Sequence, residues 1–405
     1  CGQSSGGWKR SDTVTACPSL VFLLSDGIRG HLFQGRGVAG WLSRFTGADV
    51  VEMDVPRPTG WERVRLFKWK ARFLPSKDGT GAVRWIEEAG GGQLLDCVRH
   101  ELAARNSGQN TALFLSAGSG AAPFTIALAR ATGQKCCTLM TPSVLGTAPF
   151  DFAVVPEHDH PEKRENVLST LGAPNAIFPD ELERQGWELA QKYPARETGG
   201  EENRWGVLVG GDDANYRVSP EWVRRALGPI LEAGAQADAD LYITTSRRTS
   251  PGAEAELLRL TEGNPAVRMV LLASKDPFNP VPGMLGLCSR IFVTEDSVSM
   301  VSEAVTAGRE VFLLRTERQS PGRTALQETT AFLVRKKLLP GSLLWGIPRF
   351  DALFNSMKQR GFLNEMKYDT LKFHKEGVSF PLADGPLLNE ARRAADWIME
   401  RWNEA

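Results

Sequence analysis

The second half of the chain contains a strand-to-helix turn whose polar residues suit the chemistry of phosphate groups. An apolar run at residues 291–293 ends in TED at residues 294–296, and a helix is expected to begin at Ser297 and to carry Glu303 on its second turn. The N-terminus of a helix offers free N–H groups and a positive dipole to an anion. At the carboxyl end of a parallel strand, this pattern predicts a site for a nucleoside diphosphate.

A turn further upstream, TTSRRTSP at residues 244–251, repeats this arrangement. Arg247 and Arg248 follow a predicted strand, and Ser250 precedes a proline at the expected first position of a helix. Guanidinium groups form paired, planar hydrogen bonds to phosphate oxygens, so both arginines would stabilise a departing diphosphate without a metal ion. The alternative is a solvated turn whose arginines meet nearby carboxylates. The pattern favours phosphate binding.

A glycine pair adds a third candidate segment. Gly210 and Gly211, in VLVGGDD, follow a predicted strand, where glycine allows the backbone to approach a ligand, although the GxGxxG pattern of an NAD site is missing. The carboxylate of Glu303 could accept hydrogen bonds from ribose, whereas Glu295 and Asp296 could instead complement the helix dipole. The predicted binding residues are Gly210, Gly211, Ser246, Arg247, Arg248, Thr249, Glu295, Asp296, Ser297, Ser299 and Glu303.

In the first half, the segment SDGIRGH at residues 25–31 follows the first predicted strand. This loop brings Asp26 and His31 to the end of the expected sheet, where either could act as a general base that deprotonates a hydroxyl. These two residues are the predicted catalytic groups, and a helix-capping Asp26 with a structural His31 is the alternative. Residues 116–123, SAGSGAAP, form a second small-residue turn at the same edge, which could admit an acceptor or only permit close packing.

Two further segments contain residue types that bind metals or membranes. PEHDH at residues 156–160 resembles a metal cluster, but consecutive residues cannot easily all turn to one ion and no HExxH or CxxC spacing supports it, so no metal site is predicted. Residues 57–77 interleave basic and aromatic side chains, which suits peripheral contact with a membrane or an anionic lipid-linked acceptor. An amphipathic core helix with basic residues on its outer face is the alternative.

Strand and helix signals alternate along the chain, which predicts an α/β fold with parallel sheets. The polar segment 196–204 is the best candidate for a linker. We therefore predict two Rossmann-like domains, residues 1–198 and 199–386, and a C-terminal helix within 387–405 that packs on the first domain. The expected strands are 20–24, 49–53, 111–115, 135–140, 152–155, 206–209, 240–245, 267–272, 290–294 and 310–314, and the expected helices are 32–45, 94–104, 220–233, 251–261, 297–306 and 387–402.

The composition is that of a globular protein. The 405 residues are 42% apolar and 24% charged, and the formal net charge of zero gives no global field that would favour a nucleic acid as partner. No apolar run reaches the roughly 18–20 residues that a membrane-spanning helix needs. The six cysteines form no CxxC pair, and we expect reduced thiols in a cytosolic protein. Cleavage of a lipoprotein signal before Cys1 would instead give an exported, lipid-anchored chain.

Six segments together resemble a known family. They are SDGIRGHLFQGRG (25–37), VVPEHD (154–159), NVLSTLGAPN (166–175), VLVGGDD (207–213), TTSRRTSP (244–251) and VTEDSVSMVSEA (293–304). In these segments the chain is similar to bacterial members of the elongated-mitochondria, or mitochondrial-fission, family. The resemblance implies a GT-B-like fold, in which two Rossmann-like domains face a central cleft and a C-terminal helix closes the structure. In many GT-B enzymes, a glutamate placed like Glu303 binds the ribose.

The resemblance leads to three hypotheses about function. The first is a metal-independent GT-B glycosyltransferase that takes a nucleotide-diphosphate sugar as substrate, needs no cofactor and glycosylates an unknown acceptor of the cell-envelope or lipid-linked kind. The second is a nucleoside-diphosphate-sugar epimerase or hydrolase on the same fold. The third is a non-catalytic adaptor, the role associated with plant members of the family. We expect a cytoplasmic location, with peripheral contact at the inner face of the membrane through residues 57–77.

Overall fold

The computed structural model describes residues 17–57, 61–74, 79–196, 203–339, 343, 345–366 and 388–404, with the backbone alone for 61–66. The described residues divide into two compact units, whose bounds along the chain are as follows. The first comprises Cys1–Ile28, Ala39–Ala153 and Ala394–Ala405, and the second comprises Arg29–Val38 and Val154–Arg393. Cys1 and the predicted boundary between residues 198 and 199 lie outside the described residues.

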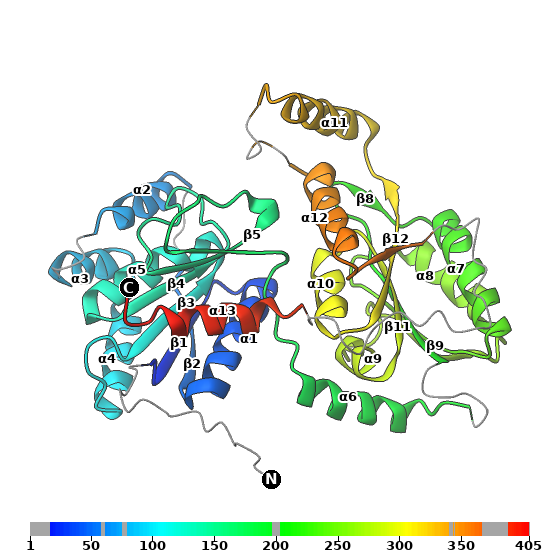
Figure 1. Cartoon of the computed structure of the whole chain (residues 1–405), viewed down its shortest axis with the longest axis horizontal. Coiled ribbons are helices and arrows are strands. Elements are labelled where there is room, and N and C mark those ends of the chain that lie inside the picture. Colours follow the sequence, from blue (N-terminus) through cyan, green and yellow to red (C-terminus); the bar gives the residue numbers. More distant parts are fainter. Residues whose placement is uncertain are drawn as a thin grey trace, which may run out of the picture. The chain divides into compact units, whose positions relative to one another are not determined.

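The described residues form two parallel six-stranded sheets with helices packed against them (Figure 1). The first sheet has the order β2 (Asp49–Asp54), β1 (Leu20–Ser25), β3 (Ala112–Ala117), β4 (Lys135–Leu139), β5 (Phe152–Pro156) and β6 (Val167–Thr170). The second has the order β10 (Val267–Leu271), β9 (Asp240–Thr245), β7 (Arg204–Val209), β11 (Arg290–Thr294), β12 (Glu310–Leu314) and β14 (Asn364–Glu365). A short antiparallel pair joins β8 (Tyr216–Arg217) to β13 (Glu317–Arg318). The predicted α/β class is confirmed.

The helices fall between these strands. Along the first half they are α1 (Arg29–Thr46), α2 (Trp61–Arg72), α3 (Gly79–Glu88), α4 (Gly92–Ala104), α5 (Gly118–Thr132), the 3-10 turn η1 (Glu157–Asp159) and α6 (Pro179–Lys192). Along the second half they are α7 (Pro220–Gln236), α8 (Pro251–Thr261), α9 (Val281–Leu287), α10 (Val298–Thr306), α11 (Pro321–Arg335), α12 (Ile347–Gln359) and α13 (Glu390–Glu400). No helix in the described ranges is both long enough and apolar enough to cross a bilayer.

The central strands are apolar on both faces because helices cover both sides of a parallel sheet. All six residues of β1 and all six of β3 are buried. Phe22 and Phe114 stack across this strand pair with ring centroids 4.8 Å apart. The side chains of Cys136 and Cys137 are buried in β4, where burial raises the pKa of both thiols, so they serve the core rather than redox chemistry.

Each sheet has one point at which its strand order reverses. In the first sheet the chain begins at β1 and extends to β2 on one side and to β3 on the other. In the second sheet it begins at β7 and extends to β9 on one side and to β11 on the other. The loops at the carboxyl ends of such strand pairs diverge and leave a crevice, which is where open α/β sheets bind ligands. We call these the first and the second switch point.

Two details of the fold bear on predictions from the sequence, one on the place of His31 and one on the packing of the C-terminal helix. Helix α1 begins at Arg29, three residues before the expected start at Leu32, so His31 lies in its first turn and not in a loop. The helix α13 and the turn after it place Trp397 and Trp402 against Phe152 of β5, with ring centroids 5.8 and 6.0 Å from the Phe152 ring.

Candidate functional site

The glycine pair lies at the second switch point, and the protein itself fills the space beside it. A Cβ on Gly210 would be 2.0 Å from Asp296 Oδ1, and one on Gly211 would be 2.1 Å from the carbonyl carbon of Arg248. The Gly211 N–H donates to Asp296 Oδ2 at 2.9 Å, and the Gly210 N–H donates to Thr294 Oγ1 at 2.7 Å. The two glycines therefore admit Asp296 and Arg248, whereas the sequence suggested that they admit a ligand.

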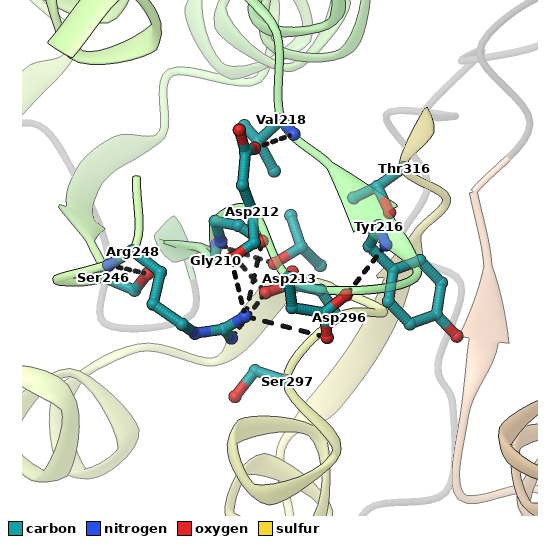
Figure 2. Close-up of polar contacts among 12 residues, drawn as sticks. Gly210, Asp212, Asp213, Tyr216, Val218, Ser246, Arg248, Asp296, Ser297 and Thr316 are labelled. Carbon is teal, nitrogen blue, oxygen red and sulfur yellow. Dashed lines mark hydrogen bonds and ion pairs between the residues drawn. The ribbon is translucent and has the colours of Figure 1, made fainter. Parts of the chain in front are cut away.

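Arg248 is held by the carboxylates around it (Figure 2). Its Nη2 lies 2.8 Å from Asp296 Oδ2, and its Nη1 lies 3.8 Å from Asp213 Oδ2 and donates to the Asp212 carbonyl at 3.4 Å. The side chain nevertheless remains 42% exposed. Arg247 is exposed and makes no ion pair with any residue in the described ranges. For Arg248 the structure therefore shows the alternative prediction, a turn whose arginine meets nearby carboxylates, whereas the Arg247 side chain is exposed to solvent.

In the rest of this turn, side chains within the turn accept hydrogen bonds from its backbone N–H groups. The Ser246 N–H donates to Thr249 Oγ1 at 3.0 Å, and the Arg248 N–H donates to Ser246 Oγ at 3.1 Å. Ser250 caps α8 by accepting from the Ala253 N–H at 3.3 Å, as its position before a proline predicted. Because these donors are already occupied, the start of α8 has little left to offer a phosphate.

Glu295 is a buried anchor. It is fully buried, and its carboxylate accepts hydrogen bonds from the Thr316 N–H at 2.8 Å, Arg315 Nη1 at 2.7 Å and Arg318 Nη1 at 3.1 Å. It connects the ends of β11 and β12 and offers no surface to a ligand. We did not predict these three partners, although LLRTER repeats the signal of an apolar strand followed by a charged turn.

The N-terminus of α10 has no side-chain cap. Ser297 occupies the N-cap position, but its hydroxyl lies 3.3 Å from Ser299 Oγ and accepts no hydrogen bond from the helix. Ser297 therefore stands at the start of α10 without capping it. The neighbouring Asp296 Oδ1 is buried without a hydrogen-bond partner among the described residues. Free N–H groups at a helix start are donors for an anion.

Glu303 lies on the second turn of α10. Burial raises the pKa of its carboxyl to about 8, although part of the side chain keeps contact with solvent. The group is therefore mainly protonated at pH 7 and can both donate and accept a hydrogen bond.

Asp212 and Asp213 belong to the same cluster of polar residues, which we did not predict, although they directly follow the glycine pair. Asp212 Oδ1 accepts the Val218 N–H at 2.8 Å. Asp213 Oδ1 accepts the N–H groups of Asn215 and Tyr216 at 2.7 and 2.8 Å. Both carboxylates shape the loop between β7 and β8, and Asp213 also faces Arg248 (Figure 2).

The two predicted catalytic residues belong to different units and are described separately. Asp26 follows β1 at the first switch point, and its Oδ1 accepts the Ile28 N–H at 3.1 Å. A Cβ on Gly120, in the first turn of α5, would lie 2.6 Å from Asp26 Oδ2, so this small residue permits close packing. His31 is partly buried in α1, whose N-cap residue is Ile28 and not Asp26.

The PEHDH segment connects η1 to α12. Arg349 donates from Nε to the His158 carbonyl at 2.9 Å and forms an ion pair with Asp159, while Arg360 pairs with Glu157 at 3.1 Å. Burial, followed by the nearby Arg349 charge, lowers the pKa of His158 to about 4, so its ring is neutral at pH 7. No group of three or more metal-binding side chains is positioned for a metal ion in the ranges that the structure describes.

The described part of the basic and aromatic segment 57–77 has features of an amphipathic core helix and also of a helix that contacts a membrane. Phe67 packs against Trp85 with ring centroids 5.9 Å apart, and Ala71 is fully buried, as in a core helix. Trp69 and Phe73 are 54% and 63% exposed, as on a membrane-facing helix. Residues 58–60 and 75–78 lie outside the described residues, and membrane contact stays a prediction.

Comparison with known proteins gives one informative match. No curated protein matches the sequence. Among solved structures, MurG from Acinetobacter baumannii is 14% identical, with a TM-score of 0.43 over 96% of this chain and 100% of that one. The UDP-GlcNAc 2-epimerase from Methanocaldococcus jannaschii is 12% identical, with a TM-score of 0.46 over 94% and 99%. Similarity at this level identifies neither a ligand nor a reaction. The model of the mitochondrial fission ELM1 family matches residues 29–339, which is more than half of the chain, and the chain therefore belongs to this family.

Proposed function

We propose that this chain is a metal-independent glycosyltransferase of the GT-B type, which transfers a sugar from a nucleotide-diphosphate donor to an acceptor. The observation that supports this best is the convergence of four polar turns at the carboxyl edge of the second sheet. The turns after β7, β9, β11 and β12 are joined by the contacts of Asp296 with Gly211 and Arg248 and of Glu295 with Thr316. Helix α10 begins at this edge without a side-chain cap.

The donor diphosphate would bind to the first N–H groups of α10, to Arg247 and to the exposed side of Arg248. Asp296 holds Arg248 in place, so little ordering of this side chain is needed when a ligand arrives. Fixed donors of this kind stabilise the charge that develops on a leaving diphosphate. The cationic and dipolar groups would supply this stabilisation in place of a metal ion.

The nucleoside would extend along α10 towards Glu303. Glu303 lies five positions after Val298, which is about 7–8 Å along the helix axis at 1.5 Å per residue. A protonated Glu303 binds a ribose hydroxyl as donor or acceptor without repelling the diphosphate. The acceptor would bind to the first unit, with Asp26 as the candidate base because it lies at the first switch point. His31 remains a candidate on the basis of the sequence alone.

One observation favours the epimerase or hydrolase hypothesis as second candidate. With a pKa of about 8, Glu303 retains a proton at neutral pH that an acid catalyst could donate. Such an enzyme would convert the nucleotide sugar in the absence of any acceptor, whereas a transferase would not.

A ligand screen tests the donor site. Thermal unfolding is followed with UDP, GDP, ADP, CMP and their common sugars, each with and without Mg²⁺, and ligands that shift the midpoint are titrated by calorimetry. Arg247→Ala should weaken binding roughly tenfold, because it removes hydrogen bonds to a charged group. The matched control is Arg335→Ala, an exposed arginine of α11.

The outcomes separate the three hypotheses. A ligand-specific rise of the midpoint that Arg247→Ala reduces and Arg335→Ala does not would support the donor site. Equal binding by the parent protein and Arg247→Ala would show that the assignment of this residue is wrong. If no nucleotide or nucleotide sugar shifts the midpoint, both enzyme hypotheses lose their basis and the adaptor hypothesis remains.

A further inference from the structure

A pocket of about 370 Å³ opens at the first switch point. It is lined by the loops after β1 and β2, by the start of α5, and by residues of α2 and α3. Its volume lies at the lower end of the range of about 300–1,000 Å³ that small-molecule sites occupy. The pocket therefore suits a small ligand or one part of a larger one.

One wall of the pocket is aromatic and offers no hydrogen-bond donor. Phe67, Trp85 and Phe124 meet edge to face, with ring centroids 5.9 Å apart for the first pair and 5.2 Å apart for the second. The Trp85 indole N–H already donates to the Phe67 carbonyl at 3.1 Å. A ligand that lies against these rings must itself be apolar there, because nothing replaces its hydrogen bonds to water.

Charged side chains line the pocket beside this wall. They are Asp26, Arg57 and Lys68, whose formal charges sum to +1. The Arg57 guanidinium lies over the loop after β1, since a Cβ on Gly27 would be 1.7 Å from its Nη2. Burial lowers the pKa of the Lys68 ammonium, which the charge of Asp26 partly offsets. An anionic group on the ligand would stabilise the charged form of Lys68 against its desolvation and complement the net positive charge.

We propose that this pocket binds an amphiphilic anion, that is, an apolar chain or ring that carries a phosphate-like group. The apolar part lies against Phe67, Trp85 and Phe124, and the anionic group binds Arg57 and Lys68. A hydroxyl of the same molecule then reaches Asp26. This inference rests on the proposed function only in making the bound molecule the acceptor; its binding requires no nucleotide sugar.

Calorimetry with octyl phosphate, in the absence of nucleotides and below the concentration at which the probe forms micelles, tests the proposal. Inorganic phosphate and octyl glucoside each carry half of the predicted recognition, so both should bind at least tenfold more weakly than octyl phosphate. Arg57→Gln should weaken the binding of octyl phosphate roughly tenfold, because it removes a charge-assisted hydrogen bond. Its matched control is Arg84→Gln, an exposed arginine of α3 that does not line the pocket.

A second variant makes the test independent of the charges. Ala89→Phe fills the pocket from the end of α3 and should abolish binding, while circular dichroism confirms that the protein is folded. Flotation with phosphatidylcholine vesicles that contain phosphatidic acid shows whether a bilayer lipid or only the free ester is bound. The proposal is overturned if Arg57→Gln and Arg84→Gln bind octyl phosphate equally, or if a folded Ala89→Phe protein still binds it. Loss of nucleotide-sugar binding alone would overturn the donor site and leave this pocket standing.

Discussion

The two switch points use their charged residues in different ways. At the second, the carboxylates of Glu295 and Asp296 are buried and bound by arginines and backbone N–H groups, so most of the polar side chains there hold the fold together. At the first, Asp26, Arg57 and Lys68 surround a pocket with an aromatic wall. A dense cluster of charges therefore does not by itself mark the surface that a ligand contacts. Among the described residues, the second switch point keeps Arg247, part of Arg248, the start of α10 and part of Glu303 accessible.

This difference predicts that substitutions at the second switch point mainly change stability, whereas those at the first mainly change binding.

The largest expected effect is that of Glu295→Ala. The substitution leaves the buried Thr316 N–H without its acceptor, which costs about 1–3 kcal/mol of the free energy of unfolding, and the lost charge-assisted hydrogen bonds to Arg315 and to the 33% exposed Arg318 add to this cost. Asp26→Ala removes a hydrogen bond to the exposed Ile28 N–H, a loss of about 1 kcal/mol or less, so its total cost should be smaller than that of Glu295→Ala. Urea denaturation measures both. Equal losses for the two variants would contradict the comparison.

Glu303→Gln should change how stability depends on pH. The folded protein holds the Glu303 proton up to about pH 8, whereas the unfolded chain releases it near the ordinary glutamate pKa of about 4.3. The folded state thus binds more protons between these values, so the free energy of unfolding falls as pH rises through this window. The slope is at most about 1.4 kcal/mol per pH unit, and the partial exposure of the side chain lowers it.

Urea denaturation of both proteins at intervals from pH 5 to pH 8 measures this dependence. The parent protein should lose stability relative to Glu303→Gln as pH rises, because the amide has no proton to release. A constant difference between the two proteins over this range would show that the carboxyl titrates normally and would remove the argument for an acid at this position.

Much of the fold could be predicted because its strands are buried apolar runs between polar turns. The strands at 240–245, 290–294 and 310–314 were predicted to the residue for this reason. Helix α5 was not, because Gly118, Ser119 and Gly120 at its start have the composition of a turn. These residues are helical because small side chains let α5 pack against Asp26 and the central strands.

The polar turns of the second switch point could also be found in the sequence, but not the contacts among them. The pair of Arg248 and Asp296 joins residues 48 positions apart, and it exists only because β7 lies between β9 and β11. Spacing along the chain carries no such information. For the same reason, the pocket at the first switch point could not be predicted, since its aromatic wall comes from three separate helices.

Gly27→Ala should moderately lower both the stability of the protein and its affinity for octyl phosphate. Gly27 has a φ of +76°, where alanine costs roughly 1–2 kcal/mol, and the new methyl group would displace the Arg57 guanidinium. Octyl phosphate should bind more weakly as a result. The control is Gly30→Ala in α1, where nothing lies within 4 Å of the added carbon and alanine should be neutral or stabilising. If Gly27→Ala binds octyl phosphate as tightly as the parent protein does, Arg57 does not contact the ligand.

The smallest effect on stability is expected from replacing the exposed aromatic pair of α2. Trp69 and Phe73 contact each other with ring centroids 5.1 Å apart and do not line the pocket, so Trp69→Ser with Phe73→Ser should change the free energy of unfolding by about 0.5 kcal/mol or less. Octyl phosphate binding should be unchanged. Binding to vesicles that contain phosphatidic acid should fall, because exposed aromatic and basic side chains favour an anionic membrane surface.

The matched control for this pair is Trp187→Ser, which removes an exposed tryptophan from α6. If only the α2 variant loses vesicle binding while it retains octyl phosphate, then α2 brings the protein to the bilayer and the pocket selects the molecule taken from it. If vesicle binding survives in both variants, Trp69 and Phe73 do not provide the membrane contact, and other residues bring the protein to the bilayer. The comparison between the two switch points does not depend on this contact, because octyl phosphate tests the pocket without a membrane.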